Sequence, residues 1–127
     1  MKIFRVTGLE FKTPELEQEF QLSGHIDPRL RAIECYLAFY CFTEFKKNWI
    51  ITQIARTPQG QFNIYGEMRP SKHLVIPVQA TDHRSHHLAI EEILELKQAF
   101  FRYFSQITPD ALFKHHKGTA MHVHVEV

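Results

Sequence analysis

The chain has 127 residues, of which 44% are hydrophobic and 13% aromatic, with 5 Gly and 6 Pro. This size and composition are typical of one compact domain, residues 1–127, with a buried core, and they exclude a disordered or fibrous chain. The formal net charge is +1 and no basic stripe is visible, which argues against a nucleic-acid-binding protein.

The N-terminal segment MKIFRVTGLEFKTPELEQEF carries scattered charges and no apolar run, so it is not expected to act as a signal peptide. The longest apolar run, CYLAFYCF, is too short to span a membrane, and no membrane partner is expected. Cys35 and Cys41 point in different directions on a predicted helix, so we expect both to be reduced. These features together predict synthesis in the cytoplasm.

A central helix is predicted over residues 28–46. Asp27 is placed to cap it and Pro28 occupies its first position, which is a strong start signal. Its interior is apolar on nearly all sides, so the helix should lie in the core. Residues 49–56 are short and rich in β-branched side chains and predict a strand, and residues 57–61 predict a turn.

The second half of the chain predicts a strand, a helix and a final strand. Residues 74–82 form the strand, which Pro77 should confine to a sheet edge or a bulge. Residues 88–105 form the helix, and residues 121–127 the last strand. The side chains expected to share one apolar face of the helix are Ile90, Ile93, Leu94, Phe101 and Phe104. The order predicts an α+β fold with a small, mostly antiparallel sheet packed against helices.

The last seven residues, MHVHVEV, alternate between apolar and ionisable side chains. In a strand, His122, His124 and Glu126 would share one face and the apolar residues the other. Two histidines at i and i+2 on one face are suited to binding a metal, and zinc sites of hydrolases commonly take three ligands from His, Asp or Glu. His73 and Asp82 are further candidates. The other histidines of DHRSHH, which are His83, His86 and His87, are interpreted as a solvated entrance to the next helix.

Three short motifs occur in an order that resembles a known family. They are Ser71-Lys72-His73, Ala80-Thr81-Asp82 and His122-Val123-His124. The order Ser-x-His, Ala-x-Asp and His-x-His is similar to that of zinc-dependent cell-wall peptidases. This family includes D-alanyl-D-alanine carboxypeptidases, D-Ala-D-Ala dipeptidases and phage L-alanyl-D-glutamate endopeptidases. The resemblance covers roughly residues 26–127.

The resemblance implies a zinc ion held by His73, Asp82 and His124. It also implies that Arg56 contacts substrate carboxylate or carbonyl oxygens, a role suited to its planar fork of donors.

Other residues would act around that ion. Gln61, or alternatively Gln59, would support the site together with Ser71 as a substrate-binding residue. His122 would lie beside the ligands and hydrogen-bond a substrate or an intermediate.

The chain departs from the family at three points, one of which is the absence of the Gly that the family usually has between its His and Asp. Eight residues separate His73 from Asp82, more than in the family, and a bulge around Pro77 would accommodate them. The positions where the family has its proton-accepting Glu or His hold Met121 and Thr119. The remaining candidates for that role are His116, His122 and Glu126.

The implied function is hydrolysis of peptidoglycan stem peptides at bonds that involve a D-amino acid, by a zinc-activated water. The protein would then reach the cell wall after release from the cytoplasm. One alternative is a relative that has lost catalysis and serves as a structural or binding module of a phage or mobile element. Another is a metal-free α+β protein with surface histidines. The sequence does not fix the oligomeric state.

Overall fold

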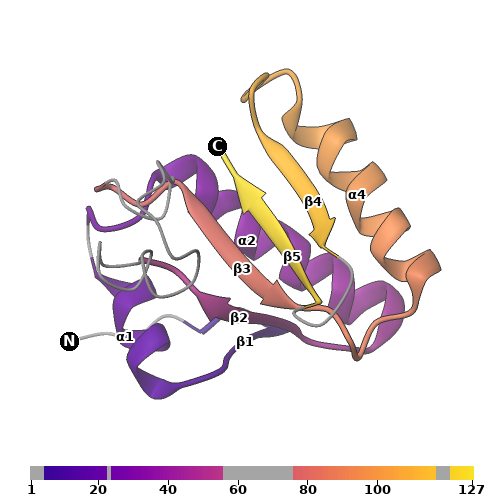
Figure 1. Ribbon diagram of the computed structural model, residues 1–127, viewed down its shortest axis with the longest axis horizontal. Coiled ribbons are helices and arrows are strands. Elements are labelled where there is room, and N and C mark those ends of the chain that lie inside the picture. Colours follow the sequence, from indigo (N-terminus) through magenta and orange to yellow (C-terminus); the bar gives the residue numbers. More distant parts are fainter. Residues whose placement is uncertain (1–4, 23, 56–75, 117–120) are drawn as a thin grey trace.

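The computed structural model describes residues 5–22, 24–55, 76–116 and 121–127 (Figure 1). Its elements are β1 (Leu9–Phe11), α1 (Pro14–Gln21), α2 (Pro28–Tyr40), the π-helical turn η1 (Cys41–Phe45), β2 (Trp49–Gln53), β3 (Ala80–Arg84), α4 (Ile90–Phe104), β4 (Leu112–His116) and β5 (His122–Glu126). The α+β fold predicted from the sequence is confirmed.

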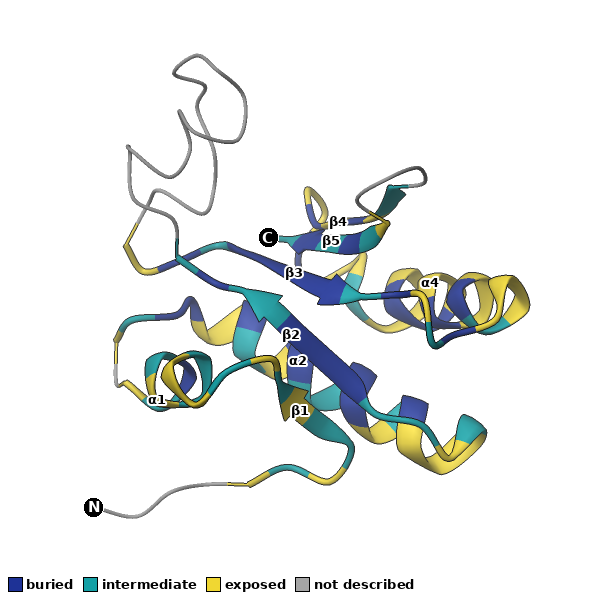
Figure 2. Cartoon of the chain, turned by 60° about the horizontal axis from the view of Figure 1, so that its bottom comes forward, coloured by how far each residue is buried: buried dark blue, intermediate teal, exposed yellow. Residues whose placement is uncertain are grey.

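The five strands form one sheet in the order β1-β2-β3-β5-β4. β1 runs parallel to β2, and the other neighbours are antiparallel. Helices α2 and α4 lie behind the sheet, and the opposite face of β3, β5 and β4 is turned toward the viewer (Figure 1). The core fills the space between the helices and the sheet, as the buried residues in Figure 2 show.

The last strand alternates as predicted. Val123 and Val125 of β5 face the helices and are fully buried, whereas His122, His124 and Glu126 are half-buried on the opposite face. We call this opposite side of β3, β5 and β4 the open face. It carries the candidate site.

Helix α2 begins and ends close to the predicted positions. The Asp27 side chain accepts a hydrogen bond from the backbone N–H of Arg29, as expected of an N-cap. The last turn is π-helical, and Lys46 ends the helix in the left-handed region with φ of 58°. The two cysteines form no disulfide, and burial raises the pKa of the Cys41 thiol to about 11.

Two predicted strands have different bounds in the structure. β2 ends at Gln53, and β3 begins only at Ala80. Pro77 was predicted to lie in a strand at a sheet edge or a bulge, but it lies before β3, which is an interior strand. A proline has no N–H to donate to a neighbouring strand, so its place outside the strand is expected. The register irregularity lies between Ile51 and Gln53 of β2, where β2 pairs with β3.

Three elements were not predicted from the sequence. They are β1, α1 and β4. β4 has the sequence LFKHH, and β1 has only three residues, so neither carries a long alternating pattern.

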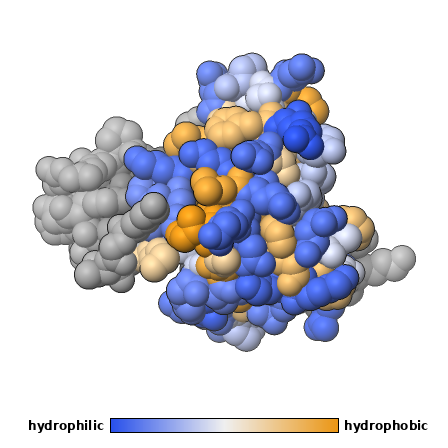
Figure 3. Space-filling view, turned by 90° about the vertical axis from the view of Figure 1, so that its right-hand side faces the viewer, coloured by the Kyte–Doolittle hydropathy of each residue, from blue (hydrophilic) through white to orange (hydrophobic). Residues whose placement is uncertain are grey.

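The apolar face predicted for the second helix is wrong for three of its five residues. Ile90, Leu94 and Phe101 of α4 are exposed. The buried residues of α4 are Ile93, Leu96, Ala99 and Phe100. The helix has two neighbouring apolar stripes, and only one of them contacts α2 and β4. On the side of the molecule near α4, hydrophobic side chains therefore lie among hydrophilic ones (Figure 3).

No helix in the described part of the chain is long and apolar enough to cross a membrane.

Candidate functional site

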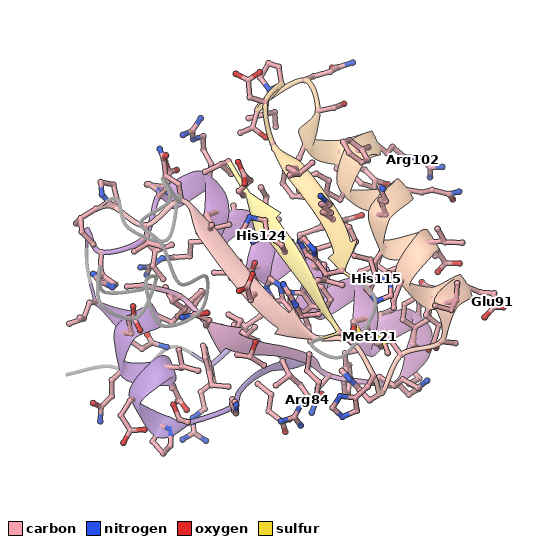
Figure 4. The ribbon with its side chains drawn as sticks, viewed as in Figure 1. Arg84, Glu91, Arg102, His115, Met121 and His124 are labelled. Atoms are coloured by element: carbon pink, nitrogen blue, oxygen red, sulfur yellow. The ribbon has the colours of Figure 1, made fainter. Side chains whose placement is uncertain are left out.

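Asp82 and His124 lie directly opposite each other on neighbouring strands. The antiparallel register of β3 and β5 pairs their Cα atoms, and strand alternation turns both side chains to the open face. His124 Nδ1 lies 2.9 Å from Asp82 Oδ1. Figure 4 labels His124 on β5, next to β3. The structure thus brings together two of the three proposed zinc ligands, which are 42 residues apart in sequence.

Glu126 occupies the other side of the His124 ring. Its Oε1 lies 2.9 Å from His124 Nε2, because residues i and i+2 of a strand share a face. Without a metal, both ring nitrogens can donate only if the imidazole is protonated. Burial alone lowers the pKa of His124, but the hydrogen bonds to Asp82 and Glu126 and their negative charges outweigh burial, so its pKa is raised overall.

Two further histidines extend the cluster toward β4. His122 Nε2 lies 4.0 Å from Asp82 Oδ1. The His116 ring stacks on the His122 ring with centroids 4.6 Å apart and also meets the His124 ring edge-on. Burial, followed by the charges of His122 and Lys114, lowers the pKa of His116.

The donor chemistry of this cluster fits part of a zinc site. A carboxylate oxygen and an imidazole nitrogen are common zinc ligands. A metal-binding histidine usually directs its other ring nitrogen to a carboxylate, which is how Glu126 meets His124. No group of three or more His, Cys, Asp or Glu able to hold a metal occurs among the described residues. Asp82 and His124 would by themselves be two ligands, and a zinc site needs at least a third.

The third proposed ligand, His73, lies outside the described residues. So do the other residues that the resemblance assigned to the segment before β3, which are Arg56, Gln59, Gln61 and Ser71.

The histidines after Asp82 do not form one solvated group. His83 is fully buried, so its interpretation as a solvated residue is wrong, because it alternates with Asp82 and points to the helices. Half-buried His87 donates from Nε2 to the carbonyl of Asn48 at 2.7 Å, and His86 is exposed. His115 of β4 also faces away from the open face, since its Nε2 lies 3.3 Å from the Ser85 hydroxyl.

A buried carboxylate beneath the site was not predicted from the sequence. Glu34 of α2 is fully buried and contacts His83. A glutamate inside the apolar stretch AIECYLAF was the available signal, since a carboxylate there must find hydrogen-bond donors in the core.

Comparisons with protein-family models, curated proteins and solved structures found no match for this chain.

Proposed function

We propose that this protein is a zinc-dependent hydrolase that cleaves peptide bonds in peptidoglycan stem peptides. The observation that carries the metal part of the proposal is the direct pairing of Asp82 and His124, with Glu126 behind the histidine ring. The substrate class rests on the motif order alone, with a D-amino acid at the cleaved bond.

Each residue of the open face has a distinct proposed role. Asp82 and His124 would hold the ion together with His73. Glu126 would keep the His124 ring in place, because a carboxylate on the outer nitrogen fixes ring orientation and raises the basicity of the ligand. This contact favours a positioning role for Glu126 over the catalytic role considered from the sequence.

The chemistry needs a proton acceptor next to the ligands. We assign this role to His122, whose ring lies beside Asp82 on the same face. When bound, zinc supplies Lewis acidity and lowers the pKa of water to about 7. His122 would take the proton from the attacking water, and Arg56, with Gln61 and Ser71, would bind the substrate and stabilise the developing oxyanion.

A second candidate is a non-catalytic relative that serves as a binding or structural module of a phage or mobile element. The observation that favours it is that both ring nitrogens of His124 already have carboxylate partners. Asp82, His124 and Glu126 can therefore form a satisfied charged triad without a metal.

The first experiment is elemental analysis of zinc per chain after incubation with zinc and removal of the excess. We compare the wild type with His124→Ala and Asp82→Asn. The matched control is His115→Ala, which removes a histidine from the adjacent strand on the other side of the sheet. We expect stoichiometric zinc in the wild type and the control and its loss in both ligand variants.

Digestion of purified peptidoglycan then separates the two candidates. Release of stem-peptide fragments by the wild type, but not by His122→Phe with zinc retained, supports the hydrolase. Stoichiometric zinc without any fragment supports the non-catalytic module. A wild type that retains no zinc contradicts the proposed metal site.

A further inference from the structure

A single carboxylate in the core receives three polar contacts. Glu34 is fully buried on α2. The indole N–H of Trp49 donates to its Oε2 at 2.9 Å, and the Thr81 hydroxyl donates to its Oε1 at 2.6 Å. Nε2 of His83 lies 2.7 Å from Oε2. This buried carboxylate is therefore fully engaged, with partners on β2 and β3.

The His83 ring continues the network to the next strand. Its Nδ1–H donates to the backbone carbonyl of Val123 at 3.0 Å. The Trp49 indole stacks on the imidazole, with centroids 4.2 Å apart and an interplanar angle of 21°. The ring is thus fixed in position and in orientation, and it links α2 to β5 through β3.

The network contacts β3 and β5 directly beneath the proposed ligands. Thr81 and His83 are the residues on either side of Asp82, and Val123 precedes His124. Asp82 pairs with His124, and His83 pairs with Val123. Because successive side chains of a strand point to opposite faces, the inner side chains of these strands hold the outer ones in register.

Stability alone is a weak reason for such a network. Apolar residues of similar volume can often replace a buried ion pair without loss of stability, whereas removing only one partner is costly. A buried polar network does, however, fix distances and directions that apolar packing leaves loose.

We propose that the Glu34–His83 network is a positioning device that sets the distance between Asp82 and His124 for metal binding. This inference rests on the proposed function, because it assigns a purpose to the network only if the two residues bind zinc. Glu34 and His83 are positioning residues and do not touch the metal.

The test measures zinc affinity by competition with a chelator, together with thermal unfolding. The main variant is the double substitution Glu34→Met with His83→Phe, which removes the carboxylate and the imidazole together and keeps apolar volume and the aromatic ring. It leaves the Trp49 indole N–H and the Thr81 hydroxyl without their acceptor, so thermal unfolding measures its loss of stability separately. We expect it to fold and to bind zinc about 10-fold more weakly than the wild type, the lower end of the range for side chains that hydrogen-bond metal ligands, because Glu34 and His83 act on the ligands only through the strands.

Two further variants make the result specific. His83→Gln, which lacks the rigid ring between Glu34 and Val123, is a milder test that should also bind more weakly. Leu96→Ala, in the core on α4, should lower stability without lowering zinc affinity. The visible spectrum of Co²⁺ in the site provides a second readout, because it reports coordination geometry and not global stability.

The outcomes are distinguishable. Wild-type zinc affinity and an unchanged Co²⁺ spectrum in the folded double variant or in His83→Gln would overturn the positioning role and leave the proposed function standing. A wild type that binds no zinc would overturn the proposed function and this inference with it. Weaker binding in Leu96→Ala equal to that in His83→Gln would also overturn the inference, since stability alone would then explain the loss.

Discussion

His124 lies between two carboxylates, one from the neighbouring strand and one from its own strand. Asp82 reaches Nδ1 from the neighbouring strand, and Glu126 reaches Nε2 from two residues further along the same strand. The same three side chains can form a charged triad or a ligand pair with an outer carboxylate. Under the proposed function, a metal would replace the proton on Nδ1.

Asp27 shows how a single residue can combine two kinds of stabilisation. It caps α2 through the Arg29 backbone N–H and also accepts hydrogen bonds from the Arg29 side chain at 3.0 and 2.8 Å. The side-chain hydrogen bond from Arg29 is the largest effect on the carboxyl and, although burial opposes it, the pKa of Asp27 is lowered from 3.8.

We expect Asp27→Ala to lower the free energy of unfolding by about 1 kcal/mol at neutral pH, the usual value of an N-cap. Because the folded pKa is depressed, the contribution of the ionised carboxylate is present above the unfolded pKa and is lost as pH falls through the folded value. Denaturant unfolding across acidic pH measures this, and the difference from wild type should shrink below pH 3.8.

The matched variant is Asp27→Asn, which keeps a capping oxygen but does not titrate. Its stability should approach that of the wild type as the pH falls. An Asp27→Ala deficit of the same size at neutral and strongly acidic pH would show that the ionised carboxylate contributes nothing.

Helix α4 packs with one of its two apolar stripes and exposes the other. Leu96 is 0% exposed and Leu94 is 54% exposed, although both are leucines within one turn of the same helix. The exposed stripe consists of Ile90, Leu94 and Phe101. Glu91 and Arg102 of the same helix project away from the sheet (Figure 4).

We expect Leu96→Ala to lower the free energy of unfolding by about 2–5 kcal/mol, because it leaves a cavity in the core. Leu94→Ala makes the same chemical change in the same helix and should cost about 0.5 kcal/mol or less. Denaturant unfolding of the two variants measures both values. Equal losses would mean that the exposed stripe is also buried in solution.

Strand β3 separates the chemistry of the two sheet faces. Asp82 points to the open face, and its neighbours Thr81 and His83 point to Glu34 in the core. We therefore expect a substitution at Thr81 or His83 to change the position of Asp82 on the open face.

Under the proposed function, zinc should stabilise the protein as a whole. A ligand that binds only the folded state, at 100 times its dissociation constant, adds about 2.7 kcal/mol to the free energy of unfolding. For a domain of this size that raises the melting temperature by roughly 10 °C. We expect zinc to produce such a rise in calorimetry or circular dichroism and a chelator to abolish it.

Two variants in the same melting experiment test whether zinc stabilises the protein by binding at His124. His115→Ala should respond to zinc like the wild type, whereas His124→Ala should not respond. A similar rise in His124→Ala would assign the stabilisation to zinc bound elsewhere on the chain.

Local patterns were enough to predict several features of this protein from its sequence. The start of α2 follows from Asp27 and Pro28, and the two faces of β5 follow from strict alternation, because capping and strand geometry depend on neighbouring residues. The motif order also predicted Asp82 and His124 as zinc ligands, and this stays a prediction.

Only the tertiary structure decided which of these side chains meet. The pairing of β3 with β5, not with β4, places Asp82 opposite His124, and the packing of α4 selects Leu96 over Leu94 for the core. The role of His83 likewise depends on Glu34, 49 residues away. These outcomes rest on contacts between distant segments, whose free energies no local pattern encodes.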